Sequence, residues 1–326
     1  MSLTKPTVFE DLSSDLHISI LEYLNAYEII ESFYNLNDYF NRLLTDYHLL
    51  LHCALLNEHN DLDILLSVIC LQQLKSLKCY DYDLLQMLNP NQFVCLHSLT
   101  VFKYATNIRE ELIIDFLLRI PQLKYCQIKI SQSHRRVEIT PSNYEKDDDD
   151  IISNLEYLDI ESKCNLSFSY FYSYILRHTP YLRYFNSSLT CQNINSNIMY
   201  EPIDNLIYLS RIILNIHSTK FEFLYLLSQA TQNLQYLRFD CSGSPSDRSF
   251  LDSRNWVQFL SSWKHLKSLN IYIKIKYTHS IDTFQAHGIQ QTFKSIPFLL
   301  ERHVCPEFYP RRSKTQVQFN AYYKAN

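Results

Sequence analysis

The side chains that come closest to a metal-binding pattern lie in the stretch YHLLLHCALL. His48 and His52 are four residues apart and Cys53 follows directly, so on a helix two or three zinc ligands would share one face. The alternative is a helix that packs under the preceding ones and turns its histidines to its wetter side. No second ligand pair at zinc-like spacing lies nearby, and we therefore expect no metal.

A run of charged residues at 146–150, KDDDD, could hold a hard cation through its carboxylates. It lacks the alternating ligand spacing of a calcium loop, which favours a solvated loop instead. The basic residues Arg135 and Arg136, and the later RRSK at Arg311, are too sparse to indicate nucleic-acid binding. We expect no nucleic-acid partner.

Scarcity of glycine excludes several enzyme classes. The chain has only Gly243 and Gly288, whereas a dinucleotide fingerprint, a P-loop and a nucleophile elbow each need closely spaced glycines. Its 12 His and 9 Cys allow many catalytic pairs to be imagined, but no motif fixes which would meet. We expect a protein that is not an enzyme and has no cofactor. An enzyme with an unrecognised site is kept as a third hypothesis.

The composition predicts a folded chain with two modules or one elongated module. Its 326 residues are 46% hydrophobic and 20% charged, and they exceed the length at which one compact core usually splits. A net charge of -4 gives no general attraction to an anionic membrane. Nine Cys without a CxxC pair favour buried thiols in a reducing compartment. With neither a signal-peptide pattern nor a membrane-length apolar run, we expect a cytoplasmic or nuclear protein.

The first 50 residues predict three short helices. Ser13 or Ser14 can cap the first, Asn25 and Glu28 have the spacing of a capping box for the second, and Asn37 can cap the third. Each helix has about ten residues or fewer, below the roughly 12 to 15 at which an isolated helix becomes marginal in water. Tertiary contacts must therefore hold them together.

These helices carry more apolar side chains than a small core can take. Leu16, Ile20 and Leu24 form one stripe, while Ile18 and Leu21 fall on another side. The surplus implies a further protein surface, in this chain or in a partner.

The run FEDLSSDLHISILEYLNAYEII, continued by NLNDYFNRLL, resembles an F-box. The family pattern is matched by Leu12, Asp15, Leu16, Ile20, Leu24, Glu28, Ile29, Ile30 and Phe40. Ser13 stands where the family usually has Pro, which is part of its docking surface. The resemblance implies binding to a Skp-type adaptor, and through it to a cullin, by Leu12, Ser13, Leu16, Ile20, Leu24, Ile29, Ile30 and Phe40. We expect Leu16, Ile20, Ile29 and Phe40 to be exposed in the isolated chain. The alternative is a helical cap on the following domain.

The rest of the chain repeats one pattern, Leu-x-x-apolar-x-residue. Successive copies start 22 to 32 residues apart, mostly within the 20 to 29 typical of leucine-rich repeats. Cys126 and Ser187 weaken two of the copies. The copies start at Leu74, Leu96, Leu123, Leu155, Leu182, Leu209, Leu234 and Leu266.

Helical patterns at 110–120, 168–178, 221–231 and 254–263 separate these copies. Pro121, Pro180 and Pro297 are expected to stop a helix and lead into a strand. The insertions SQSHRRVEITPSNYEKDDDD and SGSPSDRSFLDS read as exposed loops, and TQVQFNAYY reads as a strand that caps the last repeat. The predicted fold is α/β, a short helical F-box followed by an irregular leucine-rich-repeat solenoid with a parallel concave sheet. Its expected parts are an F-box-like module (1–50), a helical linker (51–73), irregular repeats (74–272) and a degenerate C-terminal repeat and cap (273–326).

This second segment resembles the leucine-rich repeats of F-box proteins, although the usual Asn or Cys after each strand has no fixed offset here. The resemblance implies the substrate-recognition subunit of a cullin-type (SCF) ubiquitin ligase, with a target protein held by the repeats. The alternative is a leucine-rich-repeat scaffold or inhibitor unconnected to ubiquitination.

Strand alternation predicts which residues face outward on the concave side. The position two after the first Leu is Tyr in four repeats, Ser in three (Ser76, Ser98, Ser268) and Arg in one, and the next outward positions add Gln127, Asp159, Asn186 and Arg238. Such a strip has the composition of a binding hot spot, although stacked tyrosines could equally be a structural ladder. The expected target-binding residues are Tyr125, Tyr157, Tyr184, Arg211, Tyr236 and Arg238.

Overall fold

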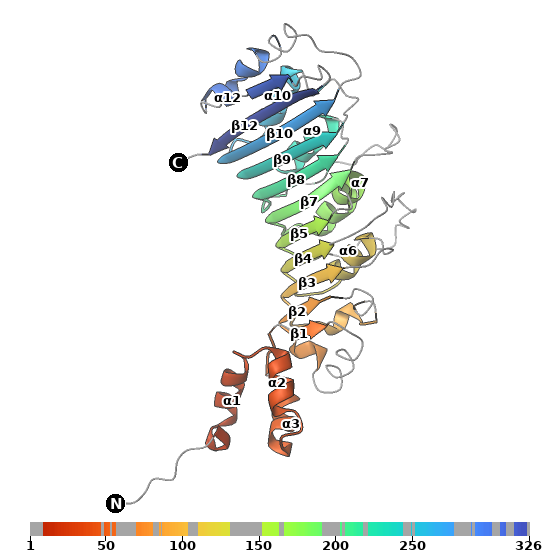
Figure 1. The fold of residues 1–326 in the computed structure, drawn as a ribbon, viewed down its shortest axis with the longest axis vertical. Helices are drawn as coiled ribbons and strands as arrows, with labels where there is room; N and C mark the ends of the chain where they lie inside the picture. The colour runs from red at the N-terminus through yellow and green to blue at the C-terminus, as the bar shows by residue number, and fades with distance from the viewer. Residues whose placement is uncertain are drawn as a thin grey trace, which may run out of the picture.

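The protein is described here from a computed structural model. The described residues are 9–46, 49–52, 54–56, 70–80, 85, 87–103, 110–130, 152–162, 166–190, 203, 206–217, 221–243, 249, 252–276, 288, 291–301, 307–310 and 316–324. The molecule is elongated, with a helical module at one end and a long twisted sheet stacked above it (Figure 1). This is the α/β architecture predicted from the sequence.

Nine parallel strands form most of the sheet within the described ranges. Their spatial order follows the chain order, apart from the short strand β6 (Leu166–Ser167), which pairs beside β7. Eight of the nine start two residues after the first Leu of a predicted repeat, so all eight predicted copies form strands. The nine are β1 (Ala54–Leu56), β2 (Ser76–Cys79), β3 (Ser98–Lys103), β4 (Tyr125–Ile130), β5 (Tyr157–Ser162), β7 (Tyr184–Thr190), β8 (Arg211–His217), β9 (Tyr236–Gly243) and β10 (Ser268–Lys276).

Two antiparallel strands form the edge of the sheet beyond β10. β12 (Gln316–Lys324) pairs along the whole of β10, and β11 (Glu307–Pro310) pairs with β12. β12 therefore covers the backbone hydrogen-bonding groups that the last parallel strand would otherwise leave open. The strand predicted at TQVQFNAYY is confirmed, including its position beside the last repeat.

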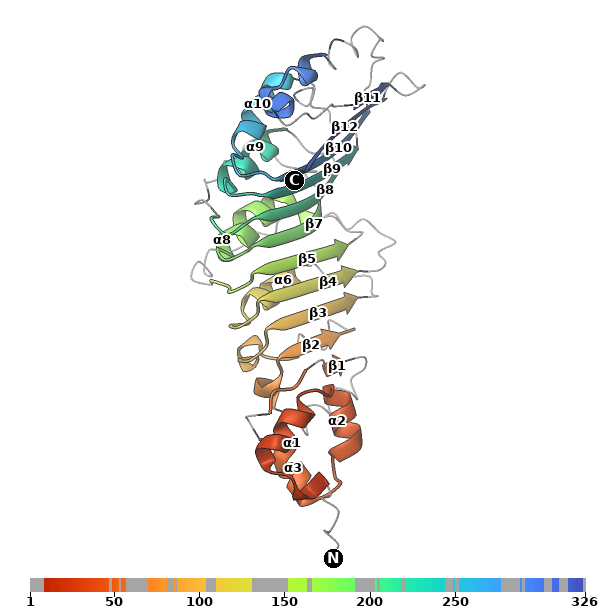
Figure 2. The same cartoon turned by 90° about the vertical axis from the view of Figure 1, so that its left-hand side faces the viewer.

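Helices cover one face of the sheet (Figure 2). Each of the four helical patterns predicted between the strands is confirmed, the second as an α–π–α run. Pro297 was expected to lead into a strand, and that prediction is wrong, because this proline is the first residue of a helix, a position that suits its fixed φ. No described helix has the length and apolar composition needed to cross a membrane. The helices behind the sheet are α6 (Glu110–Leu118), α7 (Phe168–Tyr170), the π-helix Phe171–Ile175, α8 (Leu176–His178), α9 (Phe221–Ala230), α10 (Ser253–Ser261) and α12 (Pro297–Glu301), with 3-10 turns at Leu71–Gln73 and Pro90–Gln92.

The core lies between the sheet and these helices. The first Leu of each of the eight predicted repeats is buried, and so are the first two inward positions of the strand that follows it, including Ser187 in the weakest copy. Cys79, Cys126 and Cys241 are buried thiols, and burial raises the pKa of Cys241 to about 12. The inward register predicted from the Leu-x-x-apolar pattern is confirmed.

The helix predicted over YHLLLHCALL is wrong where the structure describes it. Leu51 pairs with Leu74 in a parallel bridge, and residues 54–56 form β1, the first strand of the sheet. Leu51, Ala54 and Leu56 repeat the Leu-x-x-apolar-x-residue form one period earlier, so residues 51–56 begin the sheet and not a helical linker. Sheet pairing outweighs the local helical pattern here.

Gln73 connects the helical module to the sheet. This buried side chain donates hydrogen bonds from Nε2 to the carbonyls of Leu44 at 3.1 Å and Asp46 at 2.7 Å, and its Oε1 accepts from the backbone N–H of Cys70 at 2.9 Å. The backbone of Ala26 also donates to the carbonyl of His52 at 3.1 Å. The helices and the first strand therefore share one continuous core.

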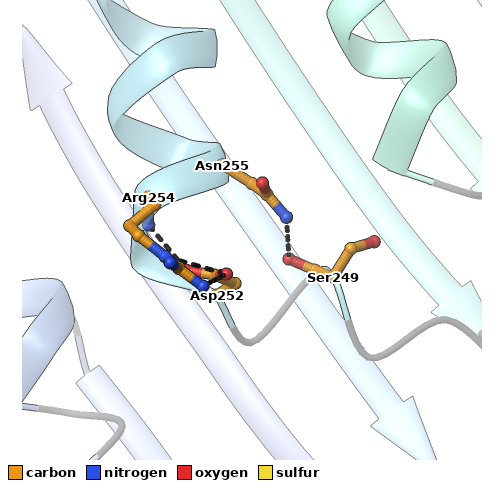
Figure 3. A network of polar contacts seen from close by, with 4 residues as sticks. All are labelled: Ser249, Asp252, Arg254 and Asn255. Carbon is orange, nitrogen blue, oxygen red and sulfur yellow. Dashed lines mark hydrogen bonds and ion pairs between the residues drawn. The ribbon is translucent and has the colours of Figure 1, made fainter.

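The two insertions expected as exposed loops fall largely on residues 131–151 and 244–251, most of which lie outside the described residues. The second leads into α10, whose start is shown in Figure 3. Asp252 caps this helix by accepting from the backbone N–H of Arg254 at 3.0 Å, and the two side chains form an ion pair at 2.7 Å. Asn255 donates to the carbonyl of Ser249 at 2.9 Å. These contacts fix where the insertion ends.

Candidate protein-binding surfaces

The N-terminal module consists of α1 (Ser14–Leu21), α2 (Ala26–Phe33) and α3 (Asp38–Leu44). Each begins at a predicted cap. Ser13 accepts from the N–H of Leu16, Asn25 forms a reciprocal capping box with Glu28, and Asn37 accepts from the N–H of Phe40. The caps supply the acceptors that such short helices lack at their first turn.

An aromatic cluster forms the centre of this module. His17 is fully buried, its Nε2 donates to the carbonyl of Phe9 at 2.7 Å, and its Nδ1 forms a hydrogen bond with the hydroxyl of Tyr39 at 2.7 Å. The ring of Phe40 lies against those of Phe9, Phe33, His17 and Tyr39. Both imidazole nitrogens are satisfied, which is what allows a polar ring in a small core.

α1 has one face in the core and one in solvent. His17 and Leu21 are buried, whereas the side chains of Leu16 and Ile20 are 46% and 36% exposed. Tyr23, which follows the helix and continues the same stripe at i, i+4, i+7, is 92% exposed. The exposure expected of Leu16 and Ile20 is confirmed.

The same expectation is wrong for Ile29 and Phe40, which are both 0% exposed. Both side chains pack in the core that the three short helices share, so the isolated chain exposes no apolar surface at these two positions. Leu12, Leu24 and Ile30 are half-buried. Of the eight residues that the resemblance assigns to adaptor binding, Leu16 and Ile20 are therefore the large apolar ones with the most accessible surface.

Ser13 occupies a backbone conformation that proline could adopt. Its φ is -69°, close to the value that the proline ring imposes. The backbone at this position thus matches the residue that the F-box pattern usually has there. What the serine adds is the capping hydrogen bond to Leu16.

On the sheet, the predicted outward residues lie in register across five neighbouring strands. Tyr125 pairs with Tyr157, Tyr157 with Tyr184, Tyr184 with Arg211 and Arg211 with Tyr236. We call these five residues the aromatic strip. Its register is the one predicted from the sequence.

Contacts within the aromatic strip are close. The rings of Tyr157 and Tyr184 stack at 4.1 Å, and the guanidinium of Arg211 lies over the rings of Tyr184 at 5.3 Å and Tyr236 at 4.4 Å. Burial, followed by a hydrogen bond with Tyr157, raises the pKa of Tyr184. Tyr125, at the end of the strip, is 52% exposed. The strip is thus stacked as a ladder at its centre and open to solvent at that end.

In the next outward row of side chains, the charged groups have partners within the row or beside it. The carboxylate of Asp159 accepts from the amides of Gln127 at 3.1 Å and Asn186 at 2.7 Å, and only 5% of this residue is exposed. Arg238 forms an ion pair with Asp240 at 2.9 Å. Arg211, by contrast, has no carboxylate partner among the described residues. It is therefore the cation of the strip that remains available to a ligand.

Only part of the residues considered as metal ligands is described by the structure. The carbonyl of His52 accepts from Ala26 in an extended segment, so the helical spacing that would have aligned it with His48 is absent from the described part. His48, Cys53 and the acidic run at 146–150 lie outside the described residues. The described side chains include no cluster of three or more potential metal ligands.

Two further exposed apolar side chains on the module were missed from the sequence. Leu36, between α2 and α3, is 56% exposed, and Tyr34 is also exposed. No sequence signal separates them from Leu24, which follows α1 at the same distance as Leu36 follows α2 and packs against the core.

Comparison with known proteins adds no relative. No protein-family model matches the chain, and no curated protein matches it either.

Proposed function

We propose that this protein is the substrate-recognition subunit of a cullin-type ubiquitin ligase. In this proposal the N-terminal module is an F-box that binds a Skp-type adaptor, and the repeat sheet is of the F-box leucine-rich-repeat type and holds a target protein. The chain itself performs no bond chemistry. Its contribution is proximity, because a tethered target has a high effective concentration near the conjugating enzyme.

The observation that carries the proposal is the outer face of α1. Leu16 and Ile20 keep large exposed fractions on a helix whose other face is packed. Exposed apolar residues grouped on one helix face are typical of a helix that packs against a partner. These two residues are also at family-pattern positions of the F-box resemblance.

The shape of the molecule supports two separate attachments. The module lies at one end of the sheet, and the aromatic strip lies on β4 to β9, further along it (Figure 1). An adaptor on α1 and a target on the strip would therefore occupy different parts of the protein.

A second candidate function is a scaffold or inhibitor whose helices only cap the repeats. The bond from Ala26 to the His52 carbonyl and the contacts of Gln73 favour it, because they show the helices closing the first strand. A cap alone gives no reason for the exposed face of α1.

Co-expression of the full chain with a Skp-type adaptor separates the two candidates. The receptor proposal expects a stable complex that co-purifies through size-exclusion chromatography. A folded chain that elutes free of the adaptor would favour the scaffold.

A further inference from the structure

A basic hollow is lined by residues that directly precede strands β7 to β10. The N-terminal ends of these strands form the left edge of the sheet in Figure 1. The hollow has a volume of about 810 Å³. Its lining includes the cations Arg183, Lys264 and Lys267 together with the imidazole of His265, and the described residues that line it include no Asp or Glu. On a chain with a net charge of -4, this is a local concentration of positive charge.

Most of these cations are not neutralised by the chain. Arg183 has a carboxylate partner, Glu156, at 3.2 Å. Within the described part of the chain, Lys264, His265 and Lys267 have none, and their side chains are exposed. Arg211 of the aromatic strip directly follows Ser210, which lines the hollow. The unpaired charge of the strip therefore adjoins that of the hollow.

The cations of the hollow are spread along the row of strand starts. Arg183 precedes β7 and Lys267 precedes β10, three strand intervals away. At about 4.8 Å per interval these positions are roughly 14 Å apart. A ligand that runs along the row of strand starts contacts the basic residues at both ends of the hollow. An extended peptide places alternate side chains about 7 Å apart on one side, so acidic residues at i, i+2 and i+4 span this length.

The wall of the hollow also has an apolar component. Tyr208 and Ile207 line it and are both exposed. The ring of Tyr208 lies 5.9 Å from that of Tyr181. A ligand therefore meets aromatic and aliphatic surface beside the cations, as a peptide with mixed acidic and apolar side chains would require.

We infer that the basic hollow binds an acidic segment of a partner protein, in an extended conformation that crosses the starts of β7 to β10. The inference rests on the proposed function, because it names the chemistry of the target that the repeats would hold. Charge complementarity supplies the attraction, and Arg211 extends it onto the aromatic strip.

The test is fluorescence anisotropy with the full chain and a labelled peptide of about 12 residues in which Glu alternates with Ser and Tyr. We expect binding that weakens with added salt and that is lost when every Glu of the peptide is Gln. Lys264→Gln with Lys267→Gln should raise the Kd about tenfold or more. The matched control is Lys75→Gln with Lys78→Gln, the same charge loss at the start of β2 and within it, which should change Kd by less than about twofold.

Three results would overturn the inference. They are no binding of the acidic peptide, an equal loss from both lysine pairs, or tighter binding of a single-phosphoserine peptide or an oligonucleotide of similar length. Adaptor binding is measured on the unsubstituted chain and on both lysine pairs. An unsubstituted chain that binds the adaptor but not the acidic peptide rejects this inference alone, whereas one that binds the peptide but not the adaptor rejects the ubiquitin-ligase proposal alone.

Discussion

The N-terminal module and the repeat sheet place their apolar side chains in opposite ways. In the eight repeat strands, the first two inward positions are buried and apolar apart from Ser187, whereas most outward positions carry polar or aromatic residues such as Tyr125, Gln127 and Arg211. In the module, α1 buries His17 and exposes Leu16 and Ile20. A sheet backed by helices can bury every inward position, whereas three short helices enclose only a small core. Exposed apolar surface is therefore informative in the module, and in the sheet the informative feature is charge without a partner.

The largest effect on folding is expected where the module's core is smallest. Phe40→Ala removes the ring around which the other aromatic residues of the module pack, and should lower the free energy of unfolding by about 3–5 kcal/mol. Leu36→Ala, at an exposed apolar position of the same module, should cost less than about 0.5 kcal/mol. Chemical denaturation monitored by circular dichroism compares the two. Equal effects would mean that the module has no core of its own.

The connection between the two regions can be weakened at Gln73. Gln73→Met keeps the length of the side chain but leaves the carbonyls of Leu44 and Asp46 without their donor, at a cost of about 1–3 kcal/mol. Hydrogen exchange should become faster in α3 and β1 but not in β8. Gln92→Met, at an exposed position, is the control. Unchanged exchange at α3 would show that the two regions are held together by other contacts.

A double substitution can decide whether the aromatic strip only stabilises the sheet or also binds a target. Tyr157→Ser with Tyr184→Ser removes the 4.1 Å stack and should cost up to about 1.5 kcal/mol, read as a lower melting temperature. Tyr322→Ser, on the exposed surface of β12, is the control. If the strip also binds targets, this double substitution should weaken binding of the acidic peptide and leave binding of the adaptor unchanged. Unchanged peptide affinity with a lower melting temperature would make the strip a structural ladder only.

The smallest effect is expected at the cap of α10. Asp252→Ala should cost about 0.5–1 kcal/mol, and Asp252→Asn less, because Asn still caps. The hydrogen bond from Arg254 lowers the pKa of Asp252 from its ordinary value of 3.8. The carboxylate's contribution is therefore complete above that value and is lost as the pH falls through the lowered pKa. Melting curves at pH 7 and pH 3 check it. Equal stability of the Asn and Ala variants at pH 7 would contradict the cap.

The sequence was most predictive where one residue type recurs at one place. The first Leu of each repeat predicted the strands, their inward register and the alignment of Tyr125, Tyr157 and Tyr184. The repeat copy that begins at Leu51 was not recognised, because Ala54 occupies its apolar position and the surrounding residues have a helical pattern. The caps at Ser13, Asn25 and Asn37 were also predictable, since capping depends on local side chains.

Burial within the module was less predictable. Ile29 and Phe40 fit the F-box pattern as well as Leu16 and Ile20 do, yet the first pair is buried and the second is exposed. The packing of α1, α2 and α3 around one another decides this, and one sequence does not state how helices cross. The basic hollow was missed for a related reason. Arg183 is far in sequence from Lys264 and Lys267, although the residue after the first Leu of a repeat is Lys75, Lys124, Arg183 or Lys267 in half of the copies.

The most direct test of the account is the affinity of the full chain for a Skp-type adaptor, measured by calorimetry with and without the pair Leu16→Glu and Ile20→Glu. The account predicts that the unmodified chain binds, and that the two charges raise Kd by about 100-fold or more because they would be desolvated at the interface. The control pair Met87→Glu and Val94→Glu, also exposed apolar residues but near the start of the sheet, should leave Kd unchanged. No binding by the unmodified chain, or equal binding by the Leu16 and Ile20 variant, would contradict the account.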